Sequence, residues 1–189
     1  MSRFLSQRFA NLTAYVPGEQ PKDKKYIKLN TNESPYPPAP AVQAALNAGA
    51  IADLRLYGDP ECTALKETLA DYLGTEPERI FVGNGSDEVL SFIFMAYCDR
   101  TTAVSYPDIS YGFYSVFADL NGVRKNEVPL KDNLTISPTS FYGLETTIVL
   151  ANPNAPTGLC LSVADIESIV KANRNNVVVI DEAYIDFGG

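Results

Sequence analysis

Residues 83–90, Gly-Asn-Gly-Ser-Asp-Glu-Val-Leu, are the starting point for predicting the fold of this chain. The short run at residues 79–82 precedes them and predicts a buried strand. Apolar residues then recur at helical spacing over residues 89–97, which predicts a tight turn and a capped helix start. Such a start offers unpaired backbone N–H groups, and glycines let an anion approach the backbone closely. We interpret the stretch as a phosphate-binding turn, while noting that an ordinary capped helix has the same signature.

Composition excludes several classes of protein. Of the 189 residues, 46% are hydrophobic and 20% charged, which suits one globular domain or a large piece of one, without a membrane-spanning run. The net charge of −8 argues against nucleic acid or an anionic membrane surface as partner. With no histidine and three scattered cysteines, we expect no metal site and no histidine-based triad. Reduced thiols and the lack of a signal-peptide core predict a cytoplasmic protein.

Strands and helices alternate along the chain. Strands are predicted at residues 101–105, 123–130, 146–151 and 176–181, and helices at residues 111–120 and 162–173. The apolar runs of the strands are continuous, which is typical of a parallel sheet covered on both faces. We therefore expect an α/β fold with a mostly parallel sheet and helices on both faces. Residues 1–30 are expected to form an N-terminal arm, and residues 31–189 the domain that carries the sheet.

Polar groups follow several of these strands. In an open α/β sheet, ligands bind at the carboxyl ends of the strands. Those ends carry the glycine turn, Tyr111, Asn154 in the turn at residues 152–158, and Asp181. Each has an ordinary structural explanation, as a rim aromatic, a turn residue or a helix cap. Together they supply a phosphate-binding turn, a flat ring, an amide and a carboxylate at one edge.

This set of groups fits one cofactor, pyridoxal 5′-phosphate. The cofactor's phosphate suits a helix N-terminus, and its ring suits an aromatic side chain such as Tyr111. Its ring nitrogen must stay protonated to withdraw electrons, and a nearby carboxylate such as Asp181 favours that state. Its phenolic oxygen needs hydrogen-bond donors, for which Asn154 and Tyr184 are candidates.

The same residues resemble a known family. The motifs are Gly-Asn-Gly-Ser-Asp-Glu at residues 83–88, Tyr106-Pro107 with Tyr111, Asn-Pro-Asn-Ala-Pro-Thr-Gly at residues 152–158, and Asp-Glu-Ala-Tyr at residues 181–184. They resemble the fold type I aminotransferases that depend on pyridoxal phosphate, with the histidinol-phosphate aminotransferase branch as the nearest match. The resemblance covers residues 11–187. It implies that residues 31–189 form the cofactor-binding large domain of that fold, incomplete at the C-terminus.

The resemblance implies a role for each residue at the predicted edge. Ser86 and Asp87, beside Gly85, would donate backbone N–H groups to the cofactor phosphate. Tyr111 would stack on the ring, and Asp181 would pair with the ring nitrogen. The phenolic oxygen would bind Tyr184.

Further residues are implied to act at the substrate entrance and across a dimer. Tyr57 would reach the phosphate of the cofactor in the neighbouring subunit, so a homodimer is expected. Tyr15, Asn32 and Glu33 would line the entrance for a small amino-acid or phosphate substrate.

The sequence departs from the family in two places. The family usually has asparagine directly before Pro-Thr-Gly, where this chain has Ala155; either Asn154 supplies that bond or the bond is lost. No lysine follows Lys171, whereas the family's Schiff-base lysine, substrate arginine and small C-terminal domain come later in the chain. We therefore expect no catalytic residue in this chain. It is expected to be an N-terminal portion that does not transaminate by itself.

The activity implied for the full-length protein is exchange of an amino group between histidinol phosphate and 2-oxoglutarate in histidine biosynthesis. Threonine-phosphate decarboxylase and other amino-acid aminotransferases share the cofactor residues and stay open as alternatives. A non-catalytic domain that binds a phosphate or nucleotide at residues 83–87 is a further alternative, although no dinucleotide glycine fingerprint supports it. A mere folding or interaction fragment is the last alternative.

Overall fold

The computed structural model of the protein describes residues 6, 9, 19, 23–24, 26–46 and 48–187. The chain divides into two compact units, residues 14–82 and a larger unit formed by residues 1–13 with 83–189. The division expected at residue 30 stays a prediction. No helix among the described residues has the length and apolar character needed to cross a membrane.

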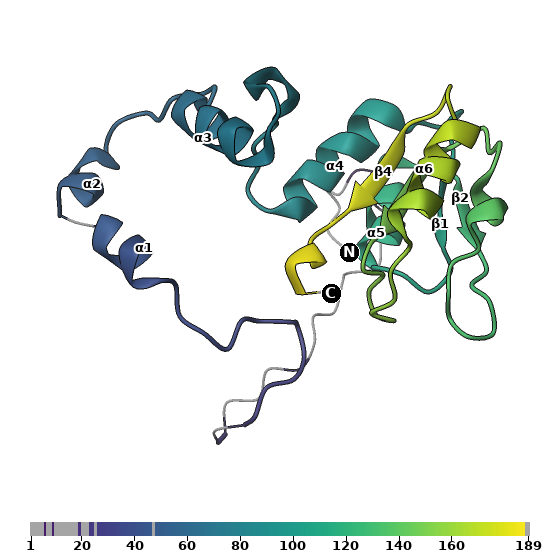
Figure 1. Ribbon diagram of the computed structural model, residues 1–189, viewed down its shortest axis with the longest axis horizontal. Helices are drawn as coiled ribbons and strands as arrows, with labels where there is room; N and C mark the ends of the chain where they lie inside the picture. Colours follow the sequence, from purple (N-terminus) through teal and green to yellow (C-terminus); the bar gives the residue numbers. More distant parts are fainter. Residues whose placement is uncertain are drawn as a thin grey trace. The chain divides into compact units, whose positions relative to one another are not determined.

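The larger unit is built on a parallel sheet (Figure 1). In the part of the chain that is described, its strands are β1 (Val104–Pro107), β2 (Lys125–Val128), β3 (Thr147–Ala151) and β4 (Val178–Asp181), in the order β2-β1-β3-β4. All neighbouring pairs are parallel. Because parallel strands share a direction, their carboxyl ends lie at one edge of the sheet.

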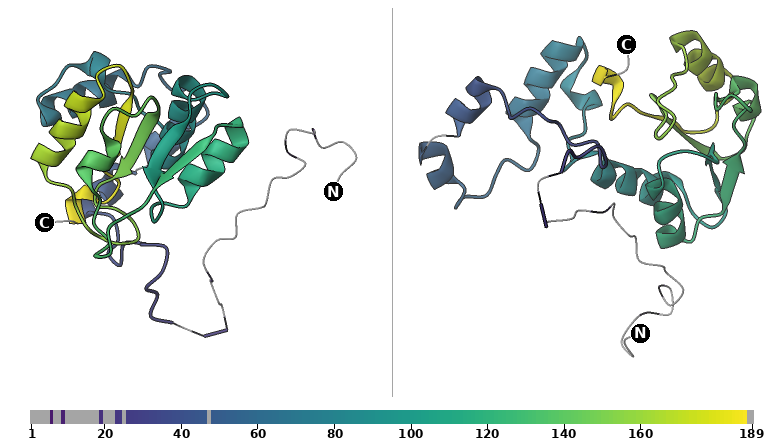
Figure 2. Two further views of the ribbon diagram at one scale, coloured as in Figure 1. Left: turned by 90° about the vertical axis from the view of Figure 1, so that its right-hand side faces the viewer. Right: turned by 90° about the horizontal axis from the view of Figure 1, so that it is seen from below.

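Helices cover both faces of this sheet, as Figure 2 shows. On one side lie α4 (Ser86–Tyr97) and α5 (Phe113–Asn121). On the other lie α6 (Val163–Ala172) and the short 3₁₀ helix η3 (Pro138–Phe141). The predicted α/β fold with a doubly covered parallel sheet is therefore confirmed.

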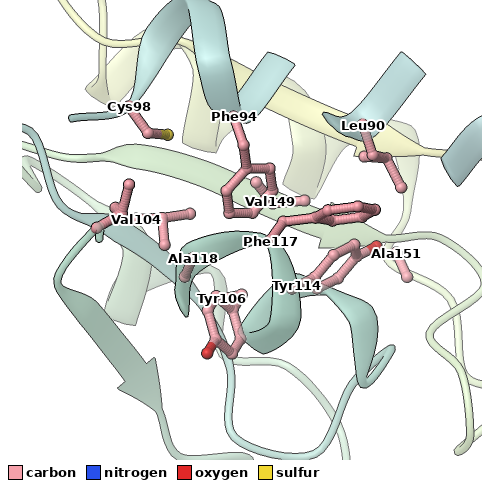
Figure 3. Close-up of a cluster of buried hydrophobic side chains, with 11 residues drawn as sticks. Leu90, Phe94, Cys98, Val104, Tyr106, Tyr114, Phe117, Ala118, Val149 and Ala151 are labelled. Carbon is pink, nitrogen blue, oxygen red and sulfur yellow. The ribbon is translucent and has the colours of Figure 1, made fainter. Parts of the chain in front are cut away.

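Alternating residues of β3 pack on opposite faces of the sheet, because successive side chains of a strand point to opposite sides. Val149 packs into the cluster that contains Phe94 of α4 and Phe117 of α5 (Figure 3). Ile148 packs into the opposite cluster with Ile169 of α6. β3 is buried along its whole length, which explains its continuous apolar run.

The predicted elements of this unit occur with somewhat different bounds. The strand expected at residues 101–105 begins only at Val104, because the Asp99 carboxylate accepts hydrogen bonds from the Thr101 and Thr102 amides, both 2.7 Å, and bends the chain into a turn. The helix expected from Ser162 is confirmed. The Ser162 hydroxyl accepts from the Asp165 amide at 3.1 Å and forms a capping box with it.

The strand predicted at residues 79–82 is wrong. Arg79 ends the 3₁₀ helix η2 (Pro77–Arg79), and Phe81 is 63% exposed. Ile80 has extended backbone angles, φ −109° and ψ 124°, but no strand among the described residues pairs with it. An apolar run becomes a strand only where a neighbour accepts its backbone hydrogen bonds.

The smaller unit consists of short helices. They are α1 (Pro40–Ala45), α2 (Ala48–Asp53), α3 (Thr63–Leu73) and η2. The Asp59 carboxylate accepts from the Thr63 amide at 2.8 Å and so caps α3, and Gly74 ends it at φ 65°. Among the described residues of this unit only Ala70 is buried, so these helices have little core of their own.

We expect Phe94→Ala to lower the free energy of unfolding by about 3–5 kcal/mol, because this ring is fully buried and its removal leaves a cavity. Met95, its 56% exposed neighbour on α4, provides the control, and Met95→Ala should change stability by less than about 0.5 kcal/mol. Urea unfolding followed by circular dichroism measures both. Equal losses in the two variants would contradict this packing.

Tyr106 gives the fold a dependence on alkaline pH. Burial raises the pKa of Tyr106 to about 12. Between pH 10 and 12 the unfolded chain loses this proton while the folded chain keeps it, so stability falls as pH rises, by at most about 1.4 kcal/mol per pH unit. Tyr106→Phe should make the fall less steep in that window and leave the slope below pH 9 unchanged. Identical slopes for the two proteins in urea titrations would exclude this contribution.

Candidate functional site

A pocket of about 270 Å³ lies at the carboxyl edge of the sheet, within the larger unit. Its volume is close to the lower end of the range for small-molecule sites, roughly 300 Å³. Four segments form it: the start of α4, the loop before α5, the turn after β3 and the residues after β4. Of the residues singled out from the sequence, it brings together Gly85, Ser86, Asp87, Tyr111, Asp181 and Tyr184.

The start of α4 presents backbone to this pocket. Gly85 is the N-cap, with φ 82° and ψ 168°, and a Cβ built there meets no atom within 4 Å. The first amides of a helix have no partner inside the helix, so those of Ser86 and Asp87 are available to an anion. The turn is held by the Glu88 carboxylate, which accepts from the Asn84 amide at 2.6 Å. None of the pocket-lining residues is lysine or arginine, so the helix start supplies the favourable field for an anion.

Tyr111 is fixed at the pocket by three contacts. Its hydroxyl donates to Asp87 Oδ1 at 2.9 Å. Its ring lies 5.7 Å from the ring of Phe113, nearly parallel at 17°, and 5.6 Å from Tyr114, edge-on at 85°. This hydrogen bond holds the Asp87 carboxylate against the tyrosine at the start of α4.

Asp181 ends β4 and lines the pocket with a half-buried carboxylate. Its Oδ2 accepts from the Tyr114 hydroxyl at 2.8 Å, and its Oδ1 accepts from the Ala183 amide at 3.2 Å. Both oxygens therefore have a fixed donor and still have lone pairs for a ligand. A carboxylate in this position can accept a hydrogen bond from a cationic ring nitrogen.

Tyr114 was not among the site residues predicted from the sequence. It is fully buried, and this burial, with the adjacent Asp181 carboxylate, raises its pKa well above the ordinary value. The available signal was its hydroxyl, because a buried tyrosine usually has a hydrogen-bond partner where phenylalanine would need none.

Asn154 is not brought to this pocket. Its Nδ2 donates to the Ile109 carbonyl at 3.0 Å and to Thr157 Oγ1 at 3.2 Å, and its Oδ1 accepts from Ser110 Oγ at 2.9 Å. Both hydrogens of the amide are therefore used within the protein. Ala155 lines the pocket in its place. The geometry does not support the idea that Asn154 replaces the missing asparagine.

The other predicted residues belong to the smaller unit or lie outside the described residues. Tyr57 is fully exposed, and Asn32 has a left-handed backbone at φ 51°. The Glu33 carboxylate binds the Lys28 ammonium group, which lowers its pKa. Tyr15 lies outside the described residues. The roles expected for these four residues stay predictions.

The residues of the pocket fit the groups of pyridoxal 5′-phosphate. Open backbone amides beside a glycine suit a phosphate. A held aromatic ring suits stacking, and a carboxylate with two fixed donors suits a protonated ring nitrogen. Tyr184 adds a hydroxyl to the pocket wall.

Comparisons with known proteins agree with this fit. Residues 24–189 match the family described as aminotransferase class I and II. The chain is 50% identical to histidinol-phosphate aminotransferase from Brachyspira hyodysenteriae, covering 99% of this chain and 53% of the relative. It is 48% identical to the enzyme of that name from Clostridium acetobutylicum, covering 100% of this chain and 54% of the relative. The chain thus spans about half the length of the curated relatives it matches.

A solved structure gives the same result for the fold. It is histidinol-phosphate aminotransferase from Sinorhizobium meliloti in complex with pyridoxal 5′-phosphate. The TM-score is 0.74 at 29% sequence identity, and the match covers 82% of this chain and 44% of that chain.

Gly85→Ala should lower the free energy of unfolding by about 1–3 kcal/mol, because residues with a Cβ rarely adopt φ 82° with ψ 168°. Gly112, the N-cap of α5, is the matched control, since its φ of −61° suits alanine and a Cβ there also meets open space. Gly112→Ala should be neutral or slightly stabilising. Thermal unfolding compares the two, and a Gly85→Ala protein as stable as the control would contradict the assigned backbone.

Proposed function

Because the chain belongs to the aminotransferase class I and II family, we propose that the whole protein transfers an amino group between histidinol phosphate and 2-oxoglutarate in histidine biosynthesis. One observation carries this proposal: identity of about half of all residues, over nearly the whole chain, with curated histidinol-phosphate aminotransferases. The match spans the start of α4, the turn after β3 and the end of β4, the segments that form the pocket.

The cofactor proposed is pyridoxal 5′-phosphate, which when bound withdraws electrons from the reacting carbon of the amino substrate. Ser86 and Asp87 would hold the phosphate through their backbone N–H groups, and Gly85 would leave room for it. Tyr111 would stack against the ring. The support for this arrangement is that all four residues line one pocket.

Asp181 would hold a proton at the ring nitrogen. Its carboxylate is already oriented by the Tyr114 hydroxyl and the Ala183 amide, so its plane is set before the cofactor binds. The Tyr184 hydroxyl would donate to the phenolic oxygen. With Ala155 in the wall and the Asn154 amide used elsewhere, Tyr184 is the donor we assign to that oxygen.

A homodimer in the cytoplasm completes the proposal. The smaller unit exposes large apolar side chains, among them Tyr57, Tyr72 and Leu73, and a partner subunit would cover such a surface. Tyr57 would then reach the neighbouring cofactor, and Tyr15, Asn32 and Glu33 would lie at the substrate entrance. The cysteines at residues 62, 98 and 160 are free thiols, in keeping with a reducing compartment.

The test is an assay of the whole protein with histidinol phosphate, 2-oxoglutarate and added pyridoxal 5′-phosphate, followed by glutamate formation. Asp181→Asn should lower turnover about a hundredfold or more, because the ring nitrogen loses its charged partner. Asp186→Asn, which changes an exposed carboxylate outside the pocket, should leave turnover unchanged.

Two results would contradict the proposal in different ways. Carbon dioxide release from threonine phosphate, with no amino transfer from histidinol phosphate, would reject the proposed substrate. Full turnover by the Asp181→Asn protein would reject the role of that carboxylate.

A further inference from the structure

We propose that Tyr114 is a positioning residue that sets the orientation of the Asp181 carboxylate in the pocket, an inference that rests on the proposed function. Tyr114 does not line the pocket itself. It lies on α5, and its hydroxyl reaches the end of β4 across 67 residues of sequence. Its hydroxyl would therefore act on a bound cofactor through Asp181.

Two donors fix the plane of the Asp181 carboxylate. A carboxylate with a single donor can rotate about its Cβ–Cγ bond, whereas donors on both oxygens fix its plane. The Tyr114 hydroxyl binds Oδ2 at 2.8 Å, and the Ala183 amide binds Oδ1 at 3.2 Å. The Ala183 amide lies two residues after Asp181 in the same segment, so this hydrogen bond moves together with the segment. The Tyr114 bond ties the carboxylate to a different element of the core.

The Tyr114 side chain is a rigid donor. The Tyr114 ring is fully buried in the cluster shown in Figure 3. It contacts the ring of Tyr111 at 5.6 Å and that of Tyr106 at 5.9 Å, both edge-on. A side chain packed in this way has one rotamer, so its hydroxyl offers one direction to Asp181.

The proton of this hydrogen bond belongs to Tyr114. Burial, reinforced by the charge of Asp181, raises the pKa of Tyr114 far above the ordinary value. The hydroxyl therefore keeps its proton at working pH and is the donor of the pair. The Asp181 carboxylate is the acceptor of this bond. A protonated ring nitrogen is also a donor, so it too requires an acceptor at Asp181.

The test replaces Tyr114 with phenylalanine in the whole protein, which removes the hydroxyl and keeps the ring. Because Asp181 lines the pocket, water can hydrate the freed oxygen and the protein should fold. Titration of the apoprotein with pyridoxal 5′-phosphate should give about tenfold weaker binding, the size expected for loss of a hydrogen bond to a charged group. The visible circular dichroism band of the bound cofactor should change, and kcat should fall with little change in KM for histidinol phosphate.

Tyr106→Phe is the matched control. Tyr106 belongs to the same cluster, and its hydroxyl also donates to a carboxylate, Glu127 Oε1 at 3.2 Å, but neither residue lines the pocket. This variant should keep the dissociation constant and the visible band of the original protein. Equal changes in both variants would show that only packing is affected, and would overturn the inference.

A double-mutant cycle separates action through Asp181 from any other effect. In an Asp181→Asn background, Tyr114→Phe should change cofactor binding less than twofold. A full tenfold effect in that background would overturn the inference. Unchanged cofactor binding by the Tyr114→Phe single variant would also overturn it. Neither result would affect the proposed function. Failure of the unsubstituted protein to bind pyridoxal 5′-phosphate would instead reject the proposed function. If Tyr114→Phe does not fold, a crystal structure of the unsubstituted whole protein with pyridoxal 5′-phosphate decides the question. The Tyr114 hydroxyl must then stay within hydrogen-bond distance of Asp181 Oδ2, and a broken bond would overturn the inference.

Discussion

The parallel pairing of β3 with β4 is the constraint on which the pocket depends. It sets Ala151 opposite Asp181, and the Asn152 amide donates to the Asp181 carbonyl at 2.9 Å. A shift of one residue would turn the Asp181 side chain to the other face of the sheet, away from Tyr114. Apolar clusters on both faces of β3 prevent that shift, since either face would lose its buried side chains. The core thus places the carboxylate at the pocket.

Contacts within the protein hold the polar groups of the pocket in place. It contains two carboxylates, and each is bound by a tyrosine hydroxyl, Asp87 by Tyr111 and Asp181 by Tyr114. The two tyrosine rings contact each other edge-on. Tyr111 in the loop before α5 and Tyr114 on α5 thereby connect the start of α4 with the end of β4. Asp87 lies at the start of α4, and Asp181 lies at the end of β4. Such preorganisation avoids the cost of ordering polar groups during binding.

How far the sequence predicts this structure depends on whether the signal is local. The helix begun by Ser162 and the apolar strand β3 follow from capping and burial, so they were predicted. The strand predicted at residues 79–82 did not form, because a strand requires a pairing partner that local sequence does not specify. Tyr114 was missed as a site residue because its partner is 67 residues away. Asn154 was predicted at the site but does not line the pocket, because its side-chain direction depends on contacts with the loop after β1.

A crystal structure of the whole protein with pyridoxal 5′-phosphate bound tests the central claim most directly. The account requires the phosphate oxygens at hydrogen-bond distance, about 2.7–3.2 Å, from the amides of Ser86 and Asp87. It also requires the ring nitrogen about 2.7–2.9 Å from the Asp181 carboxylate, with that carboxylate still bound by Tyr114. A cofactor seated away from the start of α4, or an Asp181 side chain turned from the ring nitrogen, would contradict it.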